Sequence, residues 1–127
     1  MRKEIENWWK QAESDFIKAE NLFKTKNFDG TAFYCQQCVE KGLKALYMVK
    51  FAENPPKTHD LILLSDKLGA PERIKEVGRR LTPTYILSRY PGITETIPAE
   101  LYSAQQGKDF LNLAKEAMEW IKKELKQ

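Results

Sequence analysis

Residues 5–23 read IENWWKQAESDFIKAENLF, and the spacing of the apolar residues in this stretch indicates a helical bundle. Steps of four and three residues alternate along one set of positions: Ile5, Trp9, Ala12, Phe16, Ala19 and Phe23. This period is typical of a helix that packs one apolar stripe against other helices. The opposite side is charged. We therefore expect a long amphipathic helix over residues 3–25 whose stripe faces the core of a bundle.

A turn and a second long helix follow. Asn27, Asp29 and Gly30 are turn-forming residues, and a short turn between two long helices makes them antiparallel neighbours. The second helix is expected over residues 29–52. Gly42 lies inside it, where glycine costs about 1 kcal/mol relative to alanine, so it predicts the close approach of another helix. The predicted core row of this helix is Ala32, Cys35, Val39, Gly42, Leu46 and Val49.

The region after the second helix predicts shorter elements. Prolines 55 and 56 end that helix, and Thr58 is expected to cap a third helix over residues 59–68. A fourth helix is expected after Pro71, because proline fits the first turn of a helix. Its expected buried row is Ile74, Val77 and Leu81.

The last third of the chain predicts a short helical element, a loop and a final long helix. The short element is expected at residues 85–87, the loop at 92–101 and the final helix at 101–125. Strand patterns are absent from the sequence. We therefore predict an all-α protein, an antiparallel four-helix up-and-down bundle with an additional short helix, in a single domain over residues 1–127.

Composition excludes several classes of protein. The net charge of +3 is too small to predict non-specific nucleic-acid binding from the total alone. No apolar run reaches the length of a membrane-spanning helix, and the first residues lack the apolar core of a signal peptide, so a cytoplasmic location is expected.

Cys35 and Cys38 have the C-x-x-C spacing of redox pairs and zinc sites. They fall inside a predicted helix, however, and His59 is the only further imidazole or thiol ligand in the chain. We expect two buried structural cysteines, no metal site and no cofactor.

One side of the second helix carries polar residues among apolar neighbours. Gln37, Lys41 and Lys44 lie at i, i+4 and i+7, and Glu40 is four residues before Lys44. Two ammonium groups and an amide in one row suit an anion-binding surface. The alternative is a solvated stripe with one helical ion pair worth about 0.3–0.5 kcal/mol.

Two later segments also combine polar groups. His59 and Asp60 lie at the expected start of the third helix, where His59 either takes part in a site or hydrogen-bonds to a loop. Arg89 and Tyr90 precede a proline; arginine suits bidentate phosphate binding and tyrosine stacks on bases. The alternative is that Arg89 holds its loop in place by forming an ion pair with a helix carboxylate such as Glu40.

These three segments together resemble the HEPN domain. The residues that carry the resemblance are, in this order, Gln37, Glu40, Lys41, Lys44 and Ala45, then Thr58, His59, Asp60 and Leu61, then Tyr85, Ser88, Arg89, Tyr90 and Pro91. The resemblance implies a helical bundle that forms a homodimer. It also implies nucleotide binding beside a minimal nucleotidyltransferase, in a pair of the toxin–antitoxin type. The ligand-binding set that it implies consists of Gln37, Glu40, Lys41, Lys44, His59, Asp60, Arg89 and Tyr90.

Many HEPN proteins are metal-independent ribonucleases that carry an Arg followed four to six residues later by His. Here no histidine follows any arginine at that spacing, because His59 precedes Arg73, Arg79, Arg80 and Arg89. The sequence therefore assigns no catalytic residue. Two alternatives remain open: an interaction protein whose polar cluster is a docking surface or a structural network, and a ribonuclease that uses His59 and Arg89, with nucleic acid as its partner.

Overall fold

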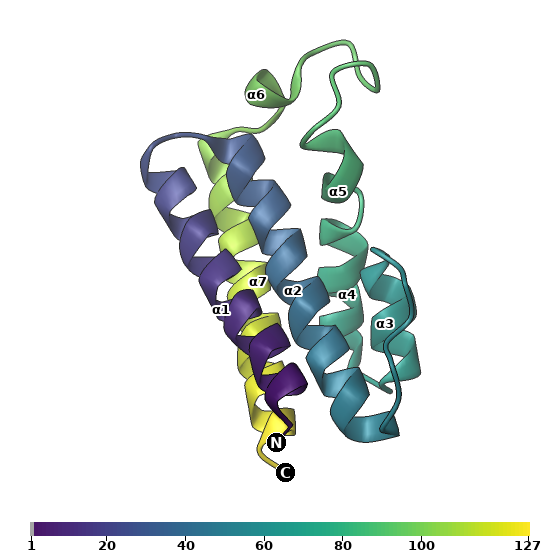
Figure 1. Ribbon diagram of the computed structural model, residues 1–127. Helices are drawn as coiled ribbons and strands as arrows, with labels where there is room; N and C mark the ends of the chain where they lie inside the picture. The colour runs from purple at the N-terminus through teal and green to yellow at the C-terminus, as the bar shows by residue number, and fades with distance from the viewer. Residues whose placement is uncertain (1) are drawn as a thin grey trace.

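The computed structural model describes residues 2–127, and its regular elements in that range are all helices. The long helices α1 (Lys3–Lys24), α2 (Phe28–Phe51) and α7 (Ala104–Leu125) lie side by side (Figure 1). The fourth side of the bundle is built from α3 (Leu61–Lys67), α4 (Glu72–Leu81) and α5 (Thr84–Leu87), and α6 (Pro98–Leu101) is a single turn at one end. The all-α class and the antiparallel bundle with short extra helices are confirmed.

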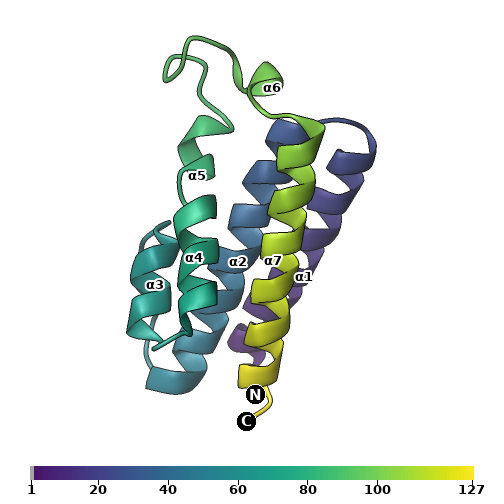
Figure 2. The ribbon, with the colours of Figure 1, turned by 180° about the vertical axis from the view of Figure 1, so that it is seen from behind.

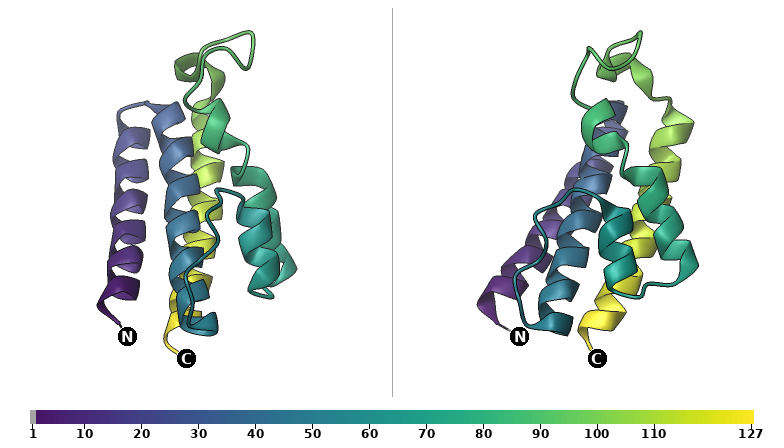
Figure 3. Two further views of the ribbon diagram at one scale, coloured as in Figure 1. Left: turned by 45° about the vertical axis from the view of Figure 1, so that its right-hand side comes forward. Right: turned by 90° about the vertical axis from the view of Figure 1, so that its right-hand side faces the viewer.

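Helix α2 is the centre of the bundle. From behind, α7 covers α2 between α1 and α4 (Figure 2), and the views in Figure 3 show α3 and α4 as a pair against another side of α2. Because neighbours surround α2, it is buried over most of its circumference, including every residue from 42 to 48. Burial all round explains why polar residues of α2 end up inside the protein.

The apolar stripe of α1 faces this core as expected. Ile5, Ala12 and Ala19 are buried, and Trp9 and Phe16 are partly buried against the core. The stripe also includes a carboxylate, because Asp15 is only 1% exposed.

Gly42 lets α1 and α7 approach α2 closely, as its position predicted. A Cβ atom at this position would lie 2.9 Å from Ile121 Cδ1 and 3.4 Å from a ring carbon of Trp9. The predicted core position of Val49 is wrong, since its side chain is 38% exposed. Val49 lines a surface hollow with Ile5 and Leu125, at the end of the bundle where the chain termini lie.

The start of the third helix differs from the prediction. Helix α3 begins at Leu61, and Asp60 rather than Thr58 is its cap. The Asp60 carboxylate accepts hydrogen bonds from the backbone N–H groups of Ile62 at 2.9 Å and Leu63 at 3.3 Å. The Thr58 hydroxyl instead accepts from the backbone N–H of Asp60, which shapes the turn before the helix.

The predicted loop over residues 92–101 is partly wrong, because Pro98–Leu101 forms α6 with proline at its first position. Helix α7 begins at Ala104 rather than near 101. Ser103 and Gln106 form a capping box at this start, a signature visible in the sequence.

Cys35 and Cys38 are buried free thiols, as expected. Burial raises the pKa of both thiols, and nearby negative charge adds to the effect. No group of three or more potential metal-binding side chains occurs within residues 2–127. Over the same residues, no helix is long and apolar enough to cross a membrane.

Candidate functional site

A buried carboxylate on α2 organises the polar residues of the predicted site. Glu40 is 4% exposed and Lys44 is 6% exposed. Glu40 Oε2 lies 3.1 Å from the Lys44 ammonium, and Glu40 Oε1 lies 2.9 Å from Nδ1 of His59. Glu40 and Lys44 are both buried, so the interpretation as a solvated stripe is wrong for this pair.

Gln36 belongs to this network, although it was not among the predicted site residues. It is fully buried, and its Nε2 donates to Glu40 Oε1 at 3.1 Å and to the backbone carbonyl of His59 at 2.9 Å. Gln37 adds a hydrogen bond from its Nε2 to Gln36 Oε1 at 2.7 Å and a longer one to Glu40 Oε1 at 3.4 Å. Gln36 precedes Glu40 by four residues, the same spacing as the Glu40–Lys44 pair, so helical spacing was the signal that could have found it.

Lys41 lies outside this network. Its ammonium lies 2.5 Å from Asp15 Oδ2 on α1, and Asp15 also accepts a hydrogen bond from Gln11. The predicted row of Gln37, Lys41 and Lys44 therefore divides between two partners. The sequence signal for the second pair was Asp15 itself, which lies on the apolar stripe between Ala12 and Ala19.

Arg89 lies on a set of aromatic rings that we call the aromatic shelf: Phe33, Tyr85 and Tyr90. The centre of its guanidinium is 4.3 Å from the ring centroid of Tyr85, 4.9 Å from that of Phe33 and 5.1 Å from that of Tyr90. Its Nε donates a hydrogen bond to the backbone carbonyl of Tyr85 at 2.9 Å, which fixes the orientation of the guanidinium. Within residues 2–127 no carboxylate lies within ion-pair distance of it, so the alternative in which Arg89 pairs with Glu40 is wrong.

The network and the shelf meet at His59. Its ring stacks on Tyr85 with centroids 3.8 Å apart and an angle of 15° between the planes. The His59 side chain is 52% exposed and Tyr90 is 51% exposed. The assembly therefore has an inner part that is closed to solvent and an outer part that a ligand can reach.

The structure thus brings together six of the eight predicted site residues: Gln37, Glu40, Lys44, His59, Arg89 and Tyr90. Lys41 is held by α1, and the Asp60 side chain caps α3. Gln36, Phe33 and Tyr85 are members that the sequence prediction missed. Phe33 gave no signal beyond being aromatic, whereas Tyr85 is part of the pattern that resembles the HEPN domain.

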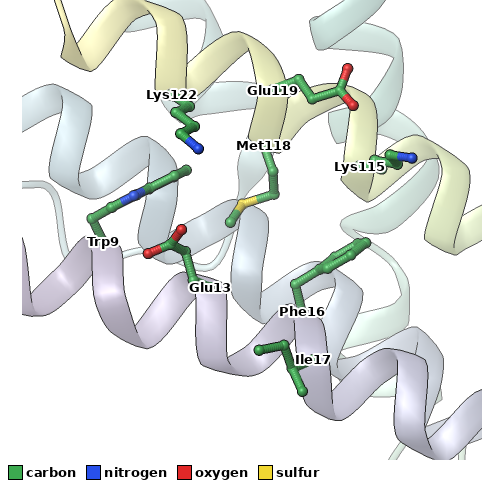
Figure 4. Close-up of a pocket in the computed structure, with 8 residues that line it drawn as sticks. All are labelled: Trp9, Glu13, Phe16, Ile17, Lys115, Met118, Glu119 and Lys122. Carbon is green, nitrogen blue, oxygen red and sulfur yellow. The ribbon is translucent and has the colours of Figure 1, made fainter.

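A separate groove of about 290 Å³ runs between α1 and α7. Trp9, Phe16 and Met118 form its apolar base, and Figure 4 shows Ile17 beside Phe16 at one end. Its charged margin consists of Glu13, Lys115, Glu119 and Lys122.

The order of the helices defines an all-α bundle in which short helices form one side. The sequence model of the HEPN domain matches residues 5–125, so the chain belongs to the HEPN domain family. This confirms the resemblance seen in the sequence.

Two crystal structures show the same fold. That of TT1696 from Thermus thermophilus is similar with a TM-score of 0.90 and 23% identity, over 97% of this chain and 99% of that chain. That of ST0689, an archaeal HEPN homologue, is similar with a TM-score of 0.81 and 29% identity, over 96% of this chain and 97% of that chain. The curated proteins contain no significant match.

Proposed function

We propose that this HEPN protein is a nucleotide-binding module whose binding surface is the aromatic shelf with His59 and Arg89. The observation that carries the proposal is the environment of Arg89. Its guanidinium is oriented by aromatic rings and by one backbone carbonyl, and within residues 2–127 it has no carboxylate partner. A fixed and unneutralised guanidinium is suited to bind phosphate through two parallel hydrogen bonds.

The residues around Arg89 supply the other contacts that a nucleotide needs. Tyr90 is half-exposed, and an aromatic ring beside a cation is a common stacking partner for a base. His59 offers a ring nitrogen from its exposed side. In this proposal Lys44 does not touch phosphate; it neutralises Glu40, which in turn orients His59.

We further propose that the module acts beside a minimal nucleotidyltransferase, in a pair of the toxin–antitoxin type. Membership of the HEPN family supports this partner, together with the resemblance found in the sequence. A binding site without an assigned catalytic residue suits a protein that works with a separate enzyme.

The test is calorimetric titration of the protein with adenosine, cytidine, guanosine and uridine nucleotides, supported by thermal-shift measurements. We expect at least one nucleotide to bind and Arg89→Ala to abolish that binding. Arg80→Ala is the matched control, because Arg80 is also exposed but lines a different hollow, with Asp109 and Glu116 of α7. If no nucleotide binds, or if both variants bind like the wild type, the proposal is wrong.

A second candidate function is a protein-interaction module without its own ligand. Two observations favour it: the buried Glu40 carboxylate is already paired within the protein, and the groove between α1 and α7 has an apolar base with charges of both signs at its margin. For this candidate the occupant of the groove is a helix of the nucleotidyltransferase, with acidic groups opposite Lys115 and Lys122.

Pull-down of the co-expressed nucleotidyltransferase without nucleotide tests this candidate. Ile17→Asp places a charge at the groove on a residue that is 56% exposed, so it should weaken capture without unfolding the protein. Leu63→Asp on α3 is the control, since Leu63 is also exposed but far from the groove. Equal capture of both variants contradicts docking in the groove.

A further inference from the structure

The hydrogen bonds around Glu40 determine which atom of Gln36 faces which neighbour. The backbone carbonyl of His59 can only accept a hydrogen bond, so the Gln36 atom 2.9 Å from it must be the donor Nε2. The same Nε2 also donates to Glu40 Oε1. The amide oxygen of Gln36 therefore points to its other neighbour, Gln37.

This orientation fixes Gln37 in turn. Gln37 Nε2 donates to Gln36 Oε1 at 2.7 Å and lies 3.4 Å from Glu40 Oε1. A rotated amide would place its oxygen against two acceptors, so the Gln37 amide cannot reverse while the network is intact. The outward atom of Gln37 is therefore always the acceptor Oε1.

Solvent reaches this acceptor. Gln37 is only half-buried, and its Oε1 accepts no hydrogen bond from residues 2–127. The buried side-chain oxygens that lack a partner in that range are those of Ser65 and Tyr102, so Gln37 Oε1 is not enclosed. A ligand at the site meets a preoriented carbonyl oxygen.

His59 presents a second acceptor by the same reasoning. A carboxylate oxygen accepts, so the proton between His59 Nδ1 and Glu40 Oε1 belongs to Nδ1. In the neutral ring, Nε2 is then the acceptor, and the ring is half-exposed. Gln37 and His59 both contact the same oxygen of Glu40, so the two side chains that carry these acceptors are neighbours.

We infer that the site selects a nucleobase bearing an exocyclic amine over the deaminated base, and that Gln37 is the residue that reads this group. The inference rests on the proposed nucleotide binding at the shelf. Adenine and cytosine offer an amine donor to Gln37 Oε1, whereas hypoxanthine and uracil place a carbonyl oxygen at the same position. Two facing acceptors repel, and the Gln37 amide cannot turn to relieve them.

Titration calorimetry with AMP, IMP, CMP and UMP tests the inference on the wild-type protein. Within each pair the exocyclic amine is replaced by a carbonyl, and the adjacent ring nitrogen (N1 of the purine, N3 of the pyrimidine) gains a proton. We expect AMP to bind at least tenfold more tightly than IMP, and CMP at least tenfold more tightly than UMP. Equal binding within each pair overturns the inference but not the proposed function. Binding of none of the four overturns the inference, and it overturns the proposed function as well if no other nucleotide binds.

Variants separate recognition of the amine from binding of the phosphate. Gln37→Met should remove the discrimination: AMP should bind more weakly because its amine loses the acceptor, and IMP more tightly because its carbonyl no longer faces one, until the two affinities are equal. Arg89→Ala should weaken all four ligands. Gln105→Met on α7 is the control, because Gln105 is an exposed glutamine distant from the site. A Gln37→Met protein that still prefers AMP to IMP overturns the assignment of Gln37.

Discussion

His59 Nδ1 lies 2.9 Å from Glu40 Oε1, and this contact joins the segment before α3 to the middle of α2. Glu40 is 4% exposed, whereas the side chain of His59 is 52% exposed. The pair therefore connects a structural interior to an accessible surface. Substitutions on the inner side should change stability, and those on the outer side should change binding.

Removing one charge of the Glu40–Lys44 ion pair should destabilise the protein much more than removing both. Glu40→Leu leaves the Lys44 ammonium buried without its partner, which should lower the free energy of unfolding by about 3–5 kcal/mol. The double variant Glu40→Leu/Lys44→Met removes both charges and should recover most of that loss. Urea unfolding followed by circular dichroism measures both. A loss below about 1 kcal/mol for Glu40→Leu would contradict the assignment.

Asp60 should act on stability alone. Asp60→Ala removes the cap of α3 and should lower the free energy of unfolding by about 1 kcal/mol, whereas Asp60→Ser should retain most of it. Nucleotide affinity should not change, because the carboxylate is committed to the backbone of Ile62 and Leu63. Calorimetry measures the nucleotide affinity of these variants and urea unfolding measures their stability. A loss of affinity with unchanged stability would show that Asp60 belongs to the binding site.

Gly42→Ala should destabilise the bundle despite the better helix propensity of alanine. Propensity contributes up to about 1 kcal/mol in favour, while crowding in a packed core costs about 1–3 kcal/mol. The new Cβ would lie 2.9 Å from Cδ1 of the fully buried Ile121, so we expect a net loss. Gly92→Ala is the control, since nothing lies within 4 Å of a Cβ there. Thermal unfolding compares the two, and a stabilised Gly42→Ala protein would contradict this account.

The two cysteines should make stability fall in mild alkali. Burial raises the pKa of both thiols in the folded protein, whereas thiols of the unfolded chain ionise near a pKa of about 8.5. Above that pH the unfolded state binds fewer protons than the folded state, so the free energy of unfolding falls as pH rises, by up to about 1.4 kcal/mol per unit for each thiol. Urea unfolding between about pH 8 and 10 should show a steeper fall for the wild type than for Cys35→Ala/Cys38→Ala. Equal slopes would show that the thiols do not contribute.

The chain should form a homodimer. The prediction comes from the family resemblance and from Trp8, Trp9 and Trp120, and the structure leaves all three of these rings only partly buried. Static light scattering at tens of micromolar should give the mass of two chains. A mass of one chain throughout the concentration range would refute dimerisation.

Local patterns were enough to predict most of the fold. The alternating steps of four and three residues along α1, the turn-forming residues after it and the proline breaks depend on neighbouring residues, and they placed the long helices within a few residues. The turn itself was expected at residues 27–30 but lies at residues 25–27, because α2 already begins at Phe28. The errors arose where two local signals compete. Thr58 and Asp60 are both good caps, and the geometry of the preceding turn decides between them.

The site was predictable only in part, because helical spacing says which residues share a face but not what packs against it. The sequence identified Glu40 and Lys44 as a pair, and the structure confirms that pair. It did not foresee that Asp15 would hold Lys41, because that contact depends on the rotation of α1 against α2.

The helical class, the antiparallel order of the long helices and membership of the HEPN family could all be read from the sequence, since they follow from local periodicity and motif order. Two features required the packed structure: the contact that fixes His59 to Glu40, and the unpaired state of Arg89 on the aromatic shelf within residues 2–127. These contacts join residues far apart in the chain. Their partners are chosen by burial and by the limited number of donors and acceptors in a packed interior, which no local pattern records.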